Sequence, residues 1–433
     1  MKFYSTNNKS ISVTLEEAVT RGLAPDNGLY MPERITPLAP SFLDGIRERS
    51  FADNAFGIAN HLLGGSIPEN ELRAIVEHTV SFDAPLHEVE NGIYALELFH
   101  GPTMAFKDYG ARFMSRVLGY FAKRQEREII ILAATSGDTG SAVANGFLGV
   151  DGTKVVVLYP KGKVSEIQEK QFTTLGKNVT ALEVEGTFDD CQRIVKQAFL
   201  DEELRGRYFL TSANSINIAR LIPQSFYYFR AFAQLPVADK PVVVSVPSGN
   251  FGNLTAGLLA QRIGLPIHHF VAATNVNDIV PEYLRTSVFT PRSSTATISN
   301  AMDVGNPSNF TRMLELFNHD YDALRSAITG YAFSDEETRN AMREVYRSTG
   351  YVLDPHGAVG YLGLRKYMKN SGDGVGIFLE TAHPAKFKET VDATLDADIQ
   401  IPDKLREFMK GQKRSVLIGR EYDAFKTFLC DNF

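Results

Sequence analysis

The sequence has few of the residues that form disulfides or bind structural metal ions in small domains. Its 433 residues contain no tryptophan and only two cysteines, Cys191 and Cys430. Two cysteines this far apart suggest neither a disulfide framework nor a metal site, and we interpret both as reduced thiols of a cytoplasmic protein. No histidine and cysteine cluster has the spacing of a zinc site, so we expect no metal ion.

The sequence also lacks long apolar runs and stretches of a single charge. Apolar runs such as Ile129–Ala134 are far shorter than a membrane span, and the first residues do not have the pattern of a signal peptide. The 45 lysines and arginines face 51 aspartates and glutamates, and no basic patch is evident. We therefore expect neither a membrane nor a nucleic acid as a partner. The composition is that of a globular protein with room for two or three domains.

From Ile93 onward, short apolar strands alternate with longer amphipathic helices. The predicted strands are Ile93–Phe99, Glu128–Ala134, Lys154–Tyr159, Val179–Val184, Pro241–Val246, Phe270–Thr274 and Gly376–Leu379. The predicted helices between them include Lys107–Arg124, Ser141–Leu148, Val164–Leu175, Phe188–Leu204, Ile216–Ala233 and Gly252–Ile263. This pattern predicts an α/β fold with mostly parallel sheets covered by helices, in which ligands bind at the carboxyl ends of the strands.

The remaining regions have weaker patterns. Residues 1–90 are predicted to form a mainly helical N-terminal segment with a capped helix at Ser12–Leu23, and residues 91–433 to form the main region. Pro281–Gly305 is rich in Ser, Thr, Pro and Asn, and we expect it to be irregular, either a substrate-facing loop or a surface excursion. Tyr422–Phe433 is predicted to pack as a final helix.

One lysine stands out in the stretch FHGPTMAFKDYGARFM. The predicted strand Ile93–Phe99 leads into a His-Gly-Pro-Thr turn, and Lys107 follows in the first turn of a predicted helix. The positive end of the helix macrodipole favours the neutral form of an amine placed there. A neutral lysine amine is a nucleophile and a base, and enzymes use it to hold a carbonyl cofactor as a Schiff base. The alternative is a solvated surface lysine, which apolar neighbours such as Phe106 and Met114 make less attractive.

Two glycine-rich loops follow predicted strands and resemble each other. They are Thr135-Ser136-Gly137-Asp138-Thr139-Gly140 and Pro247-Ser248-Gly249-Asn250-Phe251-Gly252-Asn253, each followed by a predicted helix. Glycine permits a close backbone approach and a helix start gathers unpaired amides, so each loop is a candidate anion cradle. The second loop has no carboxylate and suits a phosphate, whereas Asp138 in the first would repel a phosphate and could accept a hydrogen bond from a hydroxyl. The alternative is an ordinary turn, and no Walker, dinucleotide, zinc-protease or serine-hydrolase motif is present.

A further candidate follows the predicted strand Gly376–Leu379. Thr381 stands at the end of that strand, where its hydroxyl could lie against a ring nitrogen. A hydroxyl partner leaves a pyridine unprotonated, whereas a carboxylate would hold it as pyridinium. The alternative is that Thr381 caps the helix that follows.

Together these motifs resemble the threonine synthase family, pyridoxal-phosphate enzymes of fold type II with a tryptophan-synthase-β-like fold. The resemblance covers nearly the whole chain and is carried by ELFHGPTMAFKDYGARFM, ATSGDTGSAVANGF, LYPKGKVSEIQEKQF, SANSINIARLIPQSFYYF, VSVPSGNFGNLTAGLLA, AATNVND, ISNAMDV and TAHPAKFKE. It points to the bacterial and fungal type of that family. It implies two α/β catalytic subdomains with a small N-terminal segment, and pyridoxal 5'-phosphate as the cofactor.

The resemblance also implies roles for the candidate residues. Lys107 would hold the cofactor as an internal aldimine with Phe106 packed beside it, and Thr381 would contact the pyridine nitrogen. The cofactor phosphate would lie in a cup, here called the phosphate cup, made by Ser248, Gly249, Asn250, Phe251, Gly252 and Asn253. The first loop, here called the carboxylate loop, would hold the substrate carboxylate and reach the cofactor's ring hydroxyl through Thr135, Ser136, Gly137, Asp138 and Thr139. Asp138 departs from the wider fold type, in which asparagine is often found at this position.

The substrate of that family is O-phospho-L-homoserine, which brings a second phosphate. Side chains that could bind this dianion are Lys161 and Lys163 in YPKGKVS, and Asn217 and Arg220 in NSINIAR. Alternatively, each of these side chains is an ordinary surface residue that binds no substrate.

The implied reaction yields L-threonine and phosphate from O-phospho-L-homoserine and water, by γ-elimination of phosphate and then β-addition of water. It is the last step of threonine biosynthesis, and Lys107, once displaced by the substrate amine, would move the protons. One alternative is a serine or threonine dehydratase of the same fold. Another is a non-catalytic descendant that binds a phosphorylated ligand, which the intact set of Lys107, phosphate cup and Thr381 argues against. We expect a monomer or a homodimer.

Overall fold

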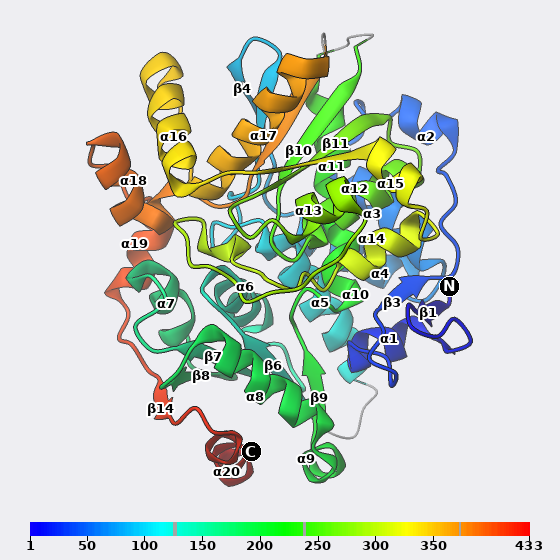
Figure 1. The fold of residues 1–433 in the computed structure, drawn as a ribbon. Helices are drawn as coiled ribbons and strands as arrows, with labels where there is room; N and C mark the ends of the chain where they lie inside the picture. The colour runs from blue at the N-terminus through cyan, green and yellow to red at the C-terminus, as the bar shows by residue number, and fades with distance from the viewer. Residues whose placement is uncertain (124–127, 237–239, 372–373) are drawn as a thin grey trace. The chain divides into compact units, whose positions relative to one another are not determined.

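The computed structural model describes residues 1–123, 128–236, 240–371 and 374–433, and the chain divides into two units by its internal contacts (Figure 1). Unit 1 comprises Met1, Met31–Phe106 and Leu221–Gln400. Unit 2 comprises Lys2–Tyr30, Lys107–Arg220 and Ile401–Phe433. Each unit thus draws on segments that are distant in the sequence, and each contains its own sheet of mainly parallel strands.

Unit 1 is built on a sheet with the strand order β12-β11-β10-β13-β5-β4. The strands are β4 (Leu86–Glu90), β5 (Ile93–Glu97), β10 (Val242–Pro247), β11 (Ile267–Thr274), β12 (Ile328–Ala332) and β13 (Val375–Glu380). Neighbouring strands from β12 to β5 pair in parallel, and β4 runs antiparallel to β5. The carboxyl ends of the parallel strands therefore share one edge, which is where ligands of such sheets bind.

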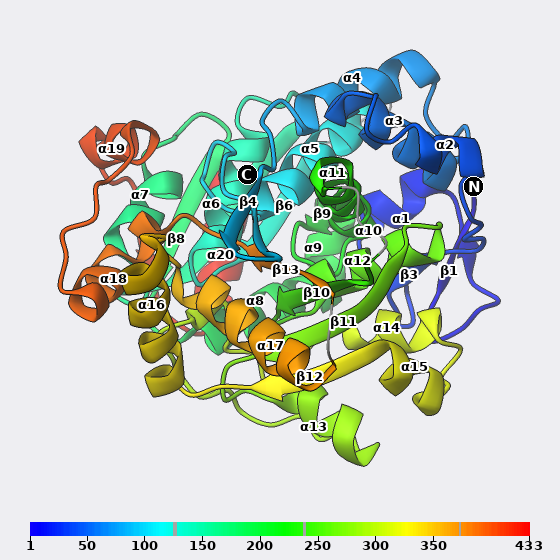
Figure 2. The same ribbon diagram turned by 90° about the horizontal axis from the view of Figure 1, so that it is seen from above.

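Unit 1 also contains helices, several of which pack on its sheet. They are α2 (Pro40–Asp44), α3 (Phe51–Leu63), α4 (Glu69–Thr79), η1 (Ile222–Ser225), α11 (Phe226–Gln234), α12 (Gly252–Arg262), α13 (Ile279–Thr286), η2 (Asn300–Met302), α14 (Phe310–Leu316), α15 (Tyr321–Ala327), α16 (Asp335–Thr349), α17 (Pro355–Ser371), η3 (Pro384–Phe387) and α18 (Lys388–Leu395). Figure 2 shows α17 lying along the sheet, and its buried side chains join those of β10, β13, α16 and α18 in one apolar cluster. Gly363 permits this close approach, because a Cβ there would come within 2.9 Å of Ala273 Cβ.

Unit 2 is built on a second sheet, in the order β14-β8-β7-β6-β9, whose paired strands all run in parallel within the described residues. The strands are β6 (Ile129–Ala134), β7 (Thr153–Pro160), β8 (Val179–Val184), β9 (Phe209–Ser212) and β14 (Val416–Ile418). The helices are α1 (Leu15–Arg21), α5 (Lys107–Ala122), α6 (Asp138–Phe147), α7 (Glu166–Thr173), α8 (Phe188–Leu200), α9 (Glu202–Arg207), α10 (Ile218–Leu221), α19 (Asp403–Lys410) and α20 (Tyr422–Asn432). β1 (Phe3–Ser5) and β2 (Ser12–Val13) form a small antiparallel pair, and β3 (Tyr30–Pro32) spans the boundary between the units.

The sheet of unit 2 is buried on both faces. Even-numbered residues of β6 and β7, such as Leu132 and Val156, pack with Ile194 of α8 and Phe425 of α20. Side chains alternate along a strand, so the odd-numbered residues face the other way. There α6 packs on the sheet so closely that a Cβ at Gly140 would lie 3.0 Å from Val157 Cγ1. Burial on both faces explains why these strands are almost continuously apolar.

The mostly parallel α/β fold expected from the sequence is confirmed, and all seven predicted strands are present, as β5, β6, β7, β8, β10, β11 and β13. The capped helix near the N-terminus is confirmed as α1, where Thr14 and Glu17 form a capping box. The predicted final helix is confirmed as α20. The division into residues 1–90 and 91–433 stays a prediction.

Some predicted boundaries were wrong. The start of Pro281–Gly305 is helical, because Ile279, Val280 and Leu284 form a buried face and a proline is tolerated in the first turn. The helix predicted to run from Phe188 to Leu204 is two helices, since Asp201 ends α8 and caps α9. The helix that begins at Lys107 extends to Ala122, and its predicted end at Arg124 lies outside the described residues.

Two searches of the described residues bear on possible partners. No helix among them is long and apolar enough to cross a membrane. Among the same residues, no group of three or more His, Cys, Asp and Glu side chains is placed to hold a metal ion.

Candidate active site

The candidate residues all follow the carboxyl ends of parallel strands. In unit 1 the phosphate cup follows β10, Thr381 follows β13, and the segment that leads to Lys107 follows β5. These three strands are direct neighbours in the sheet order. In unit 2 the carboxylate loop follows β6, Lys161 and Lys163 follow β7, and Asn217 and Arg220 follow β9. Each unit therefore gathers its candidates at one edge of its own sheet.

The turn before Lys107 is joined to the end of β13. The amide of Phe106 donates to the carbonyl of Thr381 (2.8 Å), and the amide of His383 donates to the carbonyl of Met104 (3.1 Å). Met104 has φ = 56°, a conformation that a bulky side chain rarely adopts and that tends to occur at functional sites. Phe106 and Lys107 are half-buried, and Lys107 is the first residue of α5.

Two buried residues of the TAHPAKF segment support this arrangement. Lys386 is 1% exposed, and its ammonium donates to the carbonyl of Thr103 (2.8 Å). His383 caps η3 by accepting the amide of Ala385, so Thr381 is not the cap of that helix. The alternative role for Thr381 is thereby excluded, and its buried side chain stands at the strand end as expected.

The phosphate cup is held by hydrogen bonds between its own ends. The hydroxyl of Ser248 donates to Asn253 Oδ1 (3.0 Å), and Asn253 Nδ2 donates to the carbonyl of Pro247 (2.8 Å). Phe251 adopts the left-handed conformation, with φ = 59°, directly before α12. Phe251, which precedes α12, makes no capping bond, and the amide of Leu254 donates to Asn253 Oδ1 (3.0 Å), so the amides of Gly252 and Asn253 are the ones left for a ligand.

The residues of the cup fit a phosphate group. Its side chains carry no charge, and the start of α12 contributes unpaired amides and the positive end of the helix dipole. Gly249 lies against η2, where a Cβ would come within 2.6 Å of the carbonyl oxygen of Ala301. Asn250 Oδ1 accepts the amide and the hydroxyl of Ser308. The loop is therefore fixed from outside as well as from within.

The carboxylate loop is held by one buried hydroxyl. Thr135 Oγ1 accepts the amides of Gly137 (2.9 Å) and Gly140 (2.8 Å) and donates to the carbonyl of Gly137. Gly137 has φ = 144°, and a Cβ there would lie 2.5 Å from the side chain of Gln168. Both the φ value and the close approach require glycine at this position.

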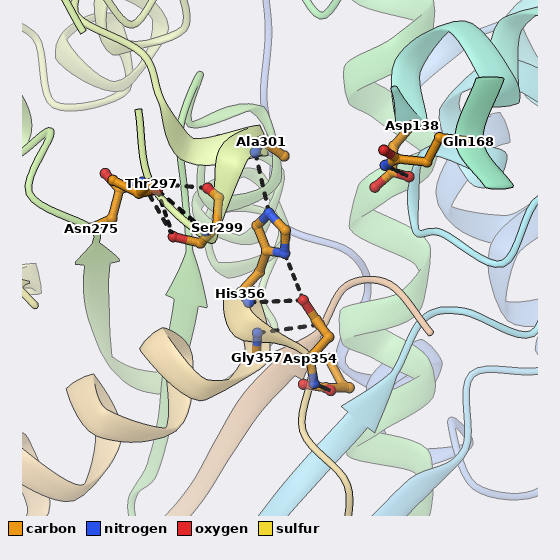
Figure 3. Close-up of polar contacts among 10 residues, drawn as sticks. Asp138, Gln168, Asn275, Thr297, Ser299, Ala301, Asp354, His356 and Gly357 are labelled. Atoms are coloured by element: carbon orange, nitrogen blue, oxygen red, sulfur yellow. Dashed lines mark hydrogen bonds and ion pairs between the residues drawn. The ribbon is translucent and has the colours of Figure 1, made fainter. Parts of the chain in front are cut away.

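Asp138 begins α6, and its carboxylate is engaged within unit 2. Its Oδ1 accepts a hydrogen bond from Gln168 Nε2 (2.9 Å), as Figure 3 shows, and its side chain is 6% exposed. Ser136 and Thr139 on the same loop are half-buried. A loop that already contains a fixed carboxylate at a helix start is poorly suited to a phosphate dianion but leaves hydroxyls and amides for a weaker anion such as a carboxylate.

The four candidates for the substrate phosphate have different surroundings. Lys161 and Lys163 are exposed, and Lys161 lies 3.5 Å from Glu185. Asn217 is fully buried and donates to the carbonyls of Val19 and Ser212.

Arg220 is also buried, and its Nη1 donates to the carbonyl of Ala213. Burial lowers the pKa of Arg220 to about 10, an effect that Asp108 opposes. The guanidinium lies against α5, because a Cβ at Gly110 would come within 2.7 Å of its Nε.

Several buried polar residues near these loops were not predicted from the sequence. They are Gln168 in unit 2, and Asp354, His356 and Glu380 in unit 1. Burial raises the pKa of Glu380 well above its usual range, and Asp354 adds to that effect. Gln168 lies in the LYPKGKVSEIQEKQF segment and so could have been suspected, whereas no motif singles out Asp354 or His356.

Three family models match the chain. Residues 79–379 match the model described as pyridoxal-phosphate dependent enzyme, residues 2–80 the model for the threonine synthase N terminus, and residues 357–429 the model for the threonine synthase C-terminal region. A threonine synthase from Haemophilus influenzae is 48% identical over 406 residues, which are 94% of this chain and 94% of that protein.

Solved structures are similar over the whole chain. A threonine synthase from Escherichia coli has 43% sequence identity and a TM-score of 0.93, and the match covers 100% of both chains. A PLP-bound threonine synthase from Brucella melitensis has 34% identity and a TM-score of 0.92, over 99% of this chain and 98% of that one.

Proposed function

This chain belongs to the threonine synthase family of pyridoxal-phosphate-dependent enzymes, and from that premise we propose that it acts on O-phospho-L-homoserine. The enzyme is a lyase of threonine biosynthesis that uses pyridoxal phosphate. The proposed reaction releases phosphate from Cγ of the substrate and adds water at Cβ, which yields L-threonine.

One observation best supports this proposal. An uncharged phosphate cup and a turn that ends in a lysine follow neighbouring parts of one sheet, and both lie within the residues that match the pyridoxal-phosphate enzyme model. The cup follows β10, and the turn is bonded to the end of β13, the neighbouring strand. When bound, pyridoxal phosphate supplies an electron sink for the negative charge that develops at the substrate Cα.

Unit 1 supplies the residues assigned to the cofactor. Ser248–Asn253 and the start of α12 bind the phosphate, and Gly249 allows the backbone to lie close to its support. Thr381 would offer the pyridine nitrogen a hydroxyl rather than a carboxylate. Phe106 packs beside the ring.

Unit 2 supplies the residues assigned to the substrate and to proton transfer. Lys107 holds the cofactor through its amine and, once released by the substrate, moves the proton at Cα. The carboxylate loop, from Thr135 to Thr139, binds the substrate carboxylate through amides and hydroxyls at the start of α6. Asp138, which Gln168 orients, would accept a hydrogen bond from a hydroxyl of the cofactor. Lys161, Lys163, Asn217 and Arg220 are the candidates for the substrate phosphate.

A phosphate-release assay with O-phospho-L-homoserine tests the proposal, with the amino-acid product identified by chromatography. We expect equal amounts of phosphate and L-threonine from the wild type. Lys107→Ala should lower the rate by about a thousandfold or more and remove the yellow absorbance of the bound cofactor. A variant that kept both would contradict the role of Lys107.

The same assay separates the two alternatives. A dehydratase would release ammonia from serine or threonine and leave O-phospho-L-homoserine unchanged. A non-catalytic descendant would stay inactive, and a purified protein that remained colourless with added pyridoxal phosphate would support that alternative. A location in the cytoplasm and a monomeric or homodimeric state complete the proposal, and sedimentation of the purified protein tests the latter.

A further inference from the structure

The backbone of the phosphate cup packs directly against the short helix η2. A Cβ built at Gly249 would come within 2.6 Å of the carbonyl oxygen of Ala301 and within 2.9 Å of Met302 Cα. Both of these atoms belong to backbone that cannot rotate away, so the two segments are in tight contact. The position of Gly249 therefore depends on where η2 is held.

A buried histidine holds the middle of η2. His356 is 3% exposed, and its Nε2 lies 3.2 Å from the amide nitrogen of Ala301 (Figure 3). An amide N–H can only donate, so Nε2 is the acceptor and carries no proton. The ring proton is therefore on Nδ1, which lies 2.6 Å from Asp354 Oδ1.

Asp354 is fixed in turn by its own hydrogen bonds. Its carboxylate accepts the amides of His356 (2.8 Å) and Gly357 (3.3 Å), and its own amide donates to Glu380 Oε1 (2.7 Å). A buried carboxylate at Nδ1 selects the tautomer of an imidazole. Glu380 is the last residue of β13, so this network begins at the strand end that precedes Thr381.

The flanks of η2 have independent supports. Asn275, directly after β11, donates to Thr297 Oγ1 (2.8 Å) and to Asp303 Oδ1 (2.8 Å). Asn275 thus anchors the chain on both sides of η2. His356 fixes the position of the middle of η2, which packs against Gly249.

We propose that His356 and Asp354 are positioning residues for the cofactor phosphate. Asp354 keeps His356 in the Nδ1-protonated form, His356 holds the amide of Ala301, and Ala301 and Met302 set the backbone of Gly249. The inference rests on the proposed function only in taking Ser248–Asn253 as the phosphate cup. Neither side chain is assigned a contact with the reacting atoms.

Two substitutions of His356 separate its two hydrogen bonds. In His356→Gln, the amide oxygen reaches the place of Nε2 and can still accept the amide of Ala301. In His356→Asn, the shorter amide reaches only the place of Nδ1, so the contact with Asp354 is kept and that with Ala301 is lost. The readout is the dissociation constant of pyridoxal phosphate, measured by absorbance on the full chain after removal of cofactor. Pyridoxal, which lacks the phosphate, is the matched ligand.

We expect His356→Asn to weaken the binding of pyridoxal phosphate about tenfold, as for a buried amide left without an acceptor, and His356→Gln to restore it to within about threefold of wild type. The affinity for pyridoxal should be the same in all three proteins. Asp354→Leu should also cost about tenfold, because it removes the acceptor of the Nδ1 proton and so the contact that keeps Nε2 free to accept the amide of Ala301. If His356→Asn does not fold, the affinity of this Asp354 variant for pyridoxal phosphate tests the proposal in its place.

His269→Gln is the matched control. His269 is also a buried imidazole of unit 1, but its Nε2 contacts Thr329 Oγ1 (2.9 Å) in the first half of β11, away from the carboxyl ends of the strands. This variant should keep the wild-type affinity. The inference is overturned if His356→Asn and His356→Gln bind pyridoxal phosphate equally well, or if pyridoxal affinity falls in parallel. A wild type that bound no pyridoxal phosphate would instead contradict the proposed function.

Discussion

The two glycine-rich loops share a Ser-Gly-x-x-Gly pattern but are held in place by different means. In unit 2, one hydroxyl, that of Thr135, bonds the amides of Gly137 and Gly140. In unit 1, the side chains of Ser248 and Asn253 bond each other across the loop, and a second segment supports it from behind. The shared pattern supplies a turn and a helix start, and the surroundings decide which anion each loop suits.

Charge is the other difference between the loops. The carboxylate loop keeps an acid, Asp138, oriented by Gln168, whereas the phosphate cup has only neutral side chains. A dianionic phosphate is repelled by the first arrangement and attracted by the second. The comparison teaches that a glycine pattern alone does not identify a phosphate site.

Alanine at the two central glycines should have the largest effects. Gly137→Ala should lower the free energy of unfolding by about 3 kcal/mol, because the residue keeps a positive φ and its Cβ meets Gln168. Gly249→Ala should cost less stability, about 1–2 kcal/mol, but should weaken pyridoxal phosphate binding more, because its Cβ meets the backbone of η2. Urea unfolding and cofactor titration measure the two effects, and the reverse ranking would break the comparison.

An exchange of charge between the loops is the next test. Asn250→Asp should weaken pyridoxal phosphate binding about a hundredfold through repulsion, since its Oδ1 can still accept from Ser308. It should leave the free energy of unfolding unchanged or raise it by about 0.5 kcal/mol, because an acid suits the start of α12.

Asp138→Asn is the reciprocal change. It should lower the free energy of unfolding by about 0.5 kcal/mol and keep the bond from Gln168. Cofactor affinity should stay within about threefold of wild type. An equal loss of affinity in both variants would mean that charge does not distinguish the loops.

In each loop, the hydroxyl that holds the loop should affect stability less than the central glycine does. Thr135→Val removes three hydrogen bonds of a buried oxygen and should lower the free energy of unfolding by about 2 kcal/mol. Ser248→Ala removes the bond to Asn253 and should cost about 1 kcal/mol. Chemical denaturation of both variants checks the ranking, with Ser326→Ala, an exposed serine, as the control for loss of a hydroxyl.

The last test compares the two units in acid. All nine histidines belong to unit 1, and burial lowers the pKa of His269 and of His383 to about 4. An unfolded histidine titrates near about 6.5, so between these values the unfolded chain binds more protons than the folded one. The free energy of unfolding should therefore fall by about 2–3 kcal/mol for each of these two histidines of unit 1 as the pH falls from about 6.5 to 4.

Hydrogen exchange at pH 5 and pH 7, corrected for the intrinsic rate, measures this difference. Segments of unit 1 should lose protection, and those of unit 2 should not. Glu380 acts in the opposite direction, because burial raises the pKa of its carboxyl and the folded state then holds the extra proton. Glu380→Gln should therefore make the pH dependence of stability steeper. An equal loss of protection in both units would contradict the attribution of the effect to the histidines of unit 1.

The strands that sequence patterns revealed and those that they missed differ in position. The seven predicted strands are all interior, whereas β4, β12, β9 and β14 are the edges of the two sheets. An edge strand pairs on one side only. β4 is partly exposed and its apolar residues are interrupted by His87 and Glu88, and β14 is apolar but only three residues long. Interior strands could be predicted because burial on both faces constrains nearly every residue.

The site was predictable to the extent that it is local in sequence. Lys107 at a helix start, the two glycine-rich loops and Thr381 at a strand end were all expected and lie where expected, although their roles stay proposals. The supports were not predictable. Asp354 and His356 are separated from Ala301 by more than fifty residues, and only the fold brings them together.

The division of the chain between the units has a consequence for its synthesis. Unit 1 is complete once Gln400 has been added, but unit 2 still lacks β14 and α20 at that point. Those elements supply Ile418, Phe425 and Leu429 to a core whose other members were made much earlier. On the ribosome, β8 therefore remains an uncovered edge while Leu221–Gln400 of unit 1 is translated, and a chaperone that shields that edge would act during this interval.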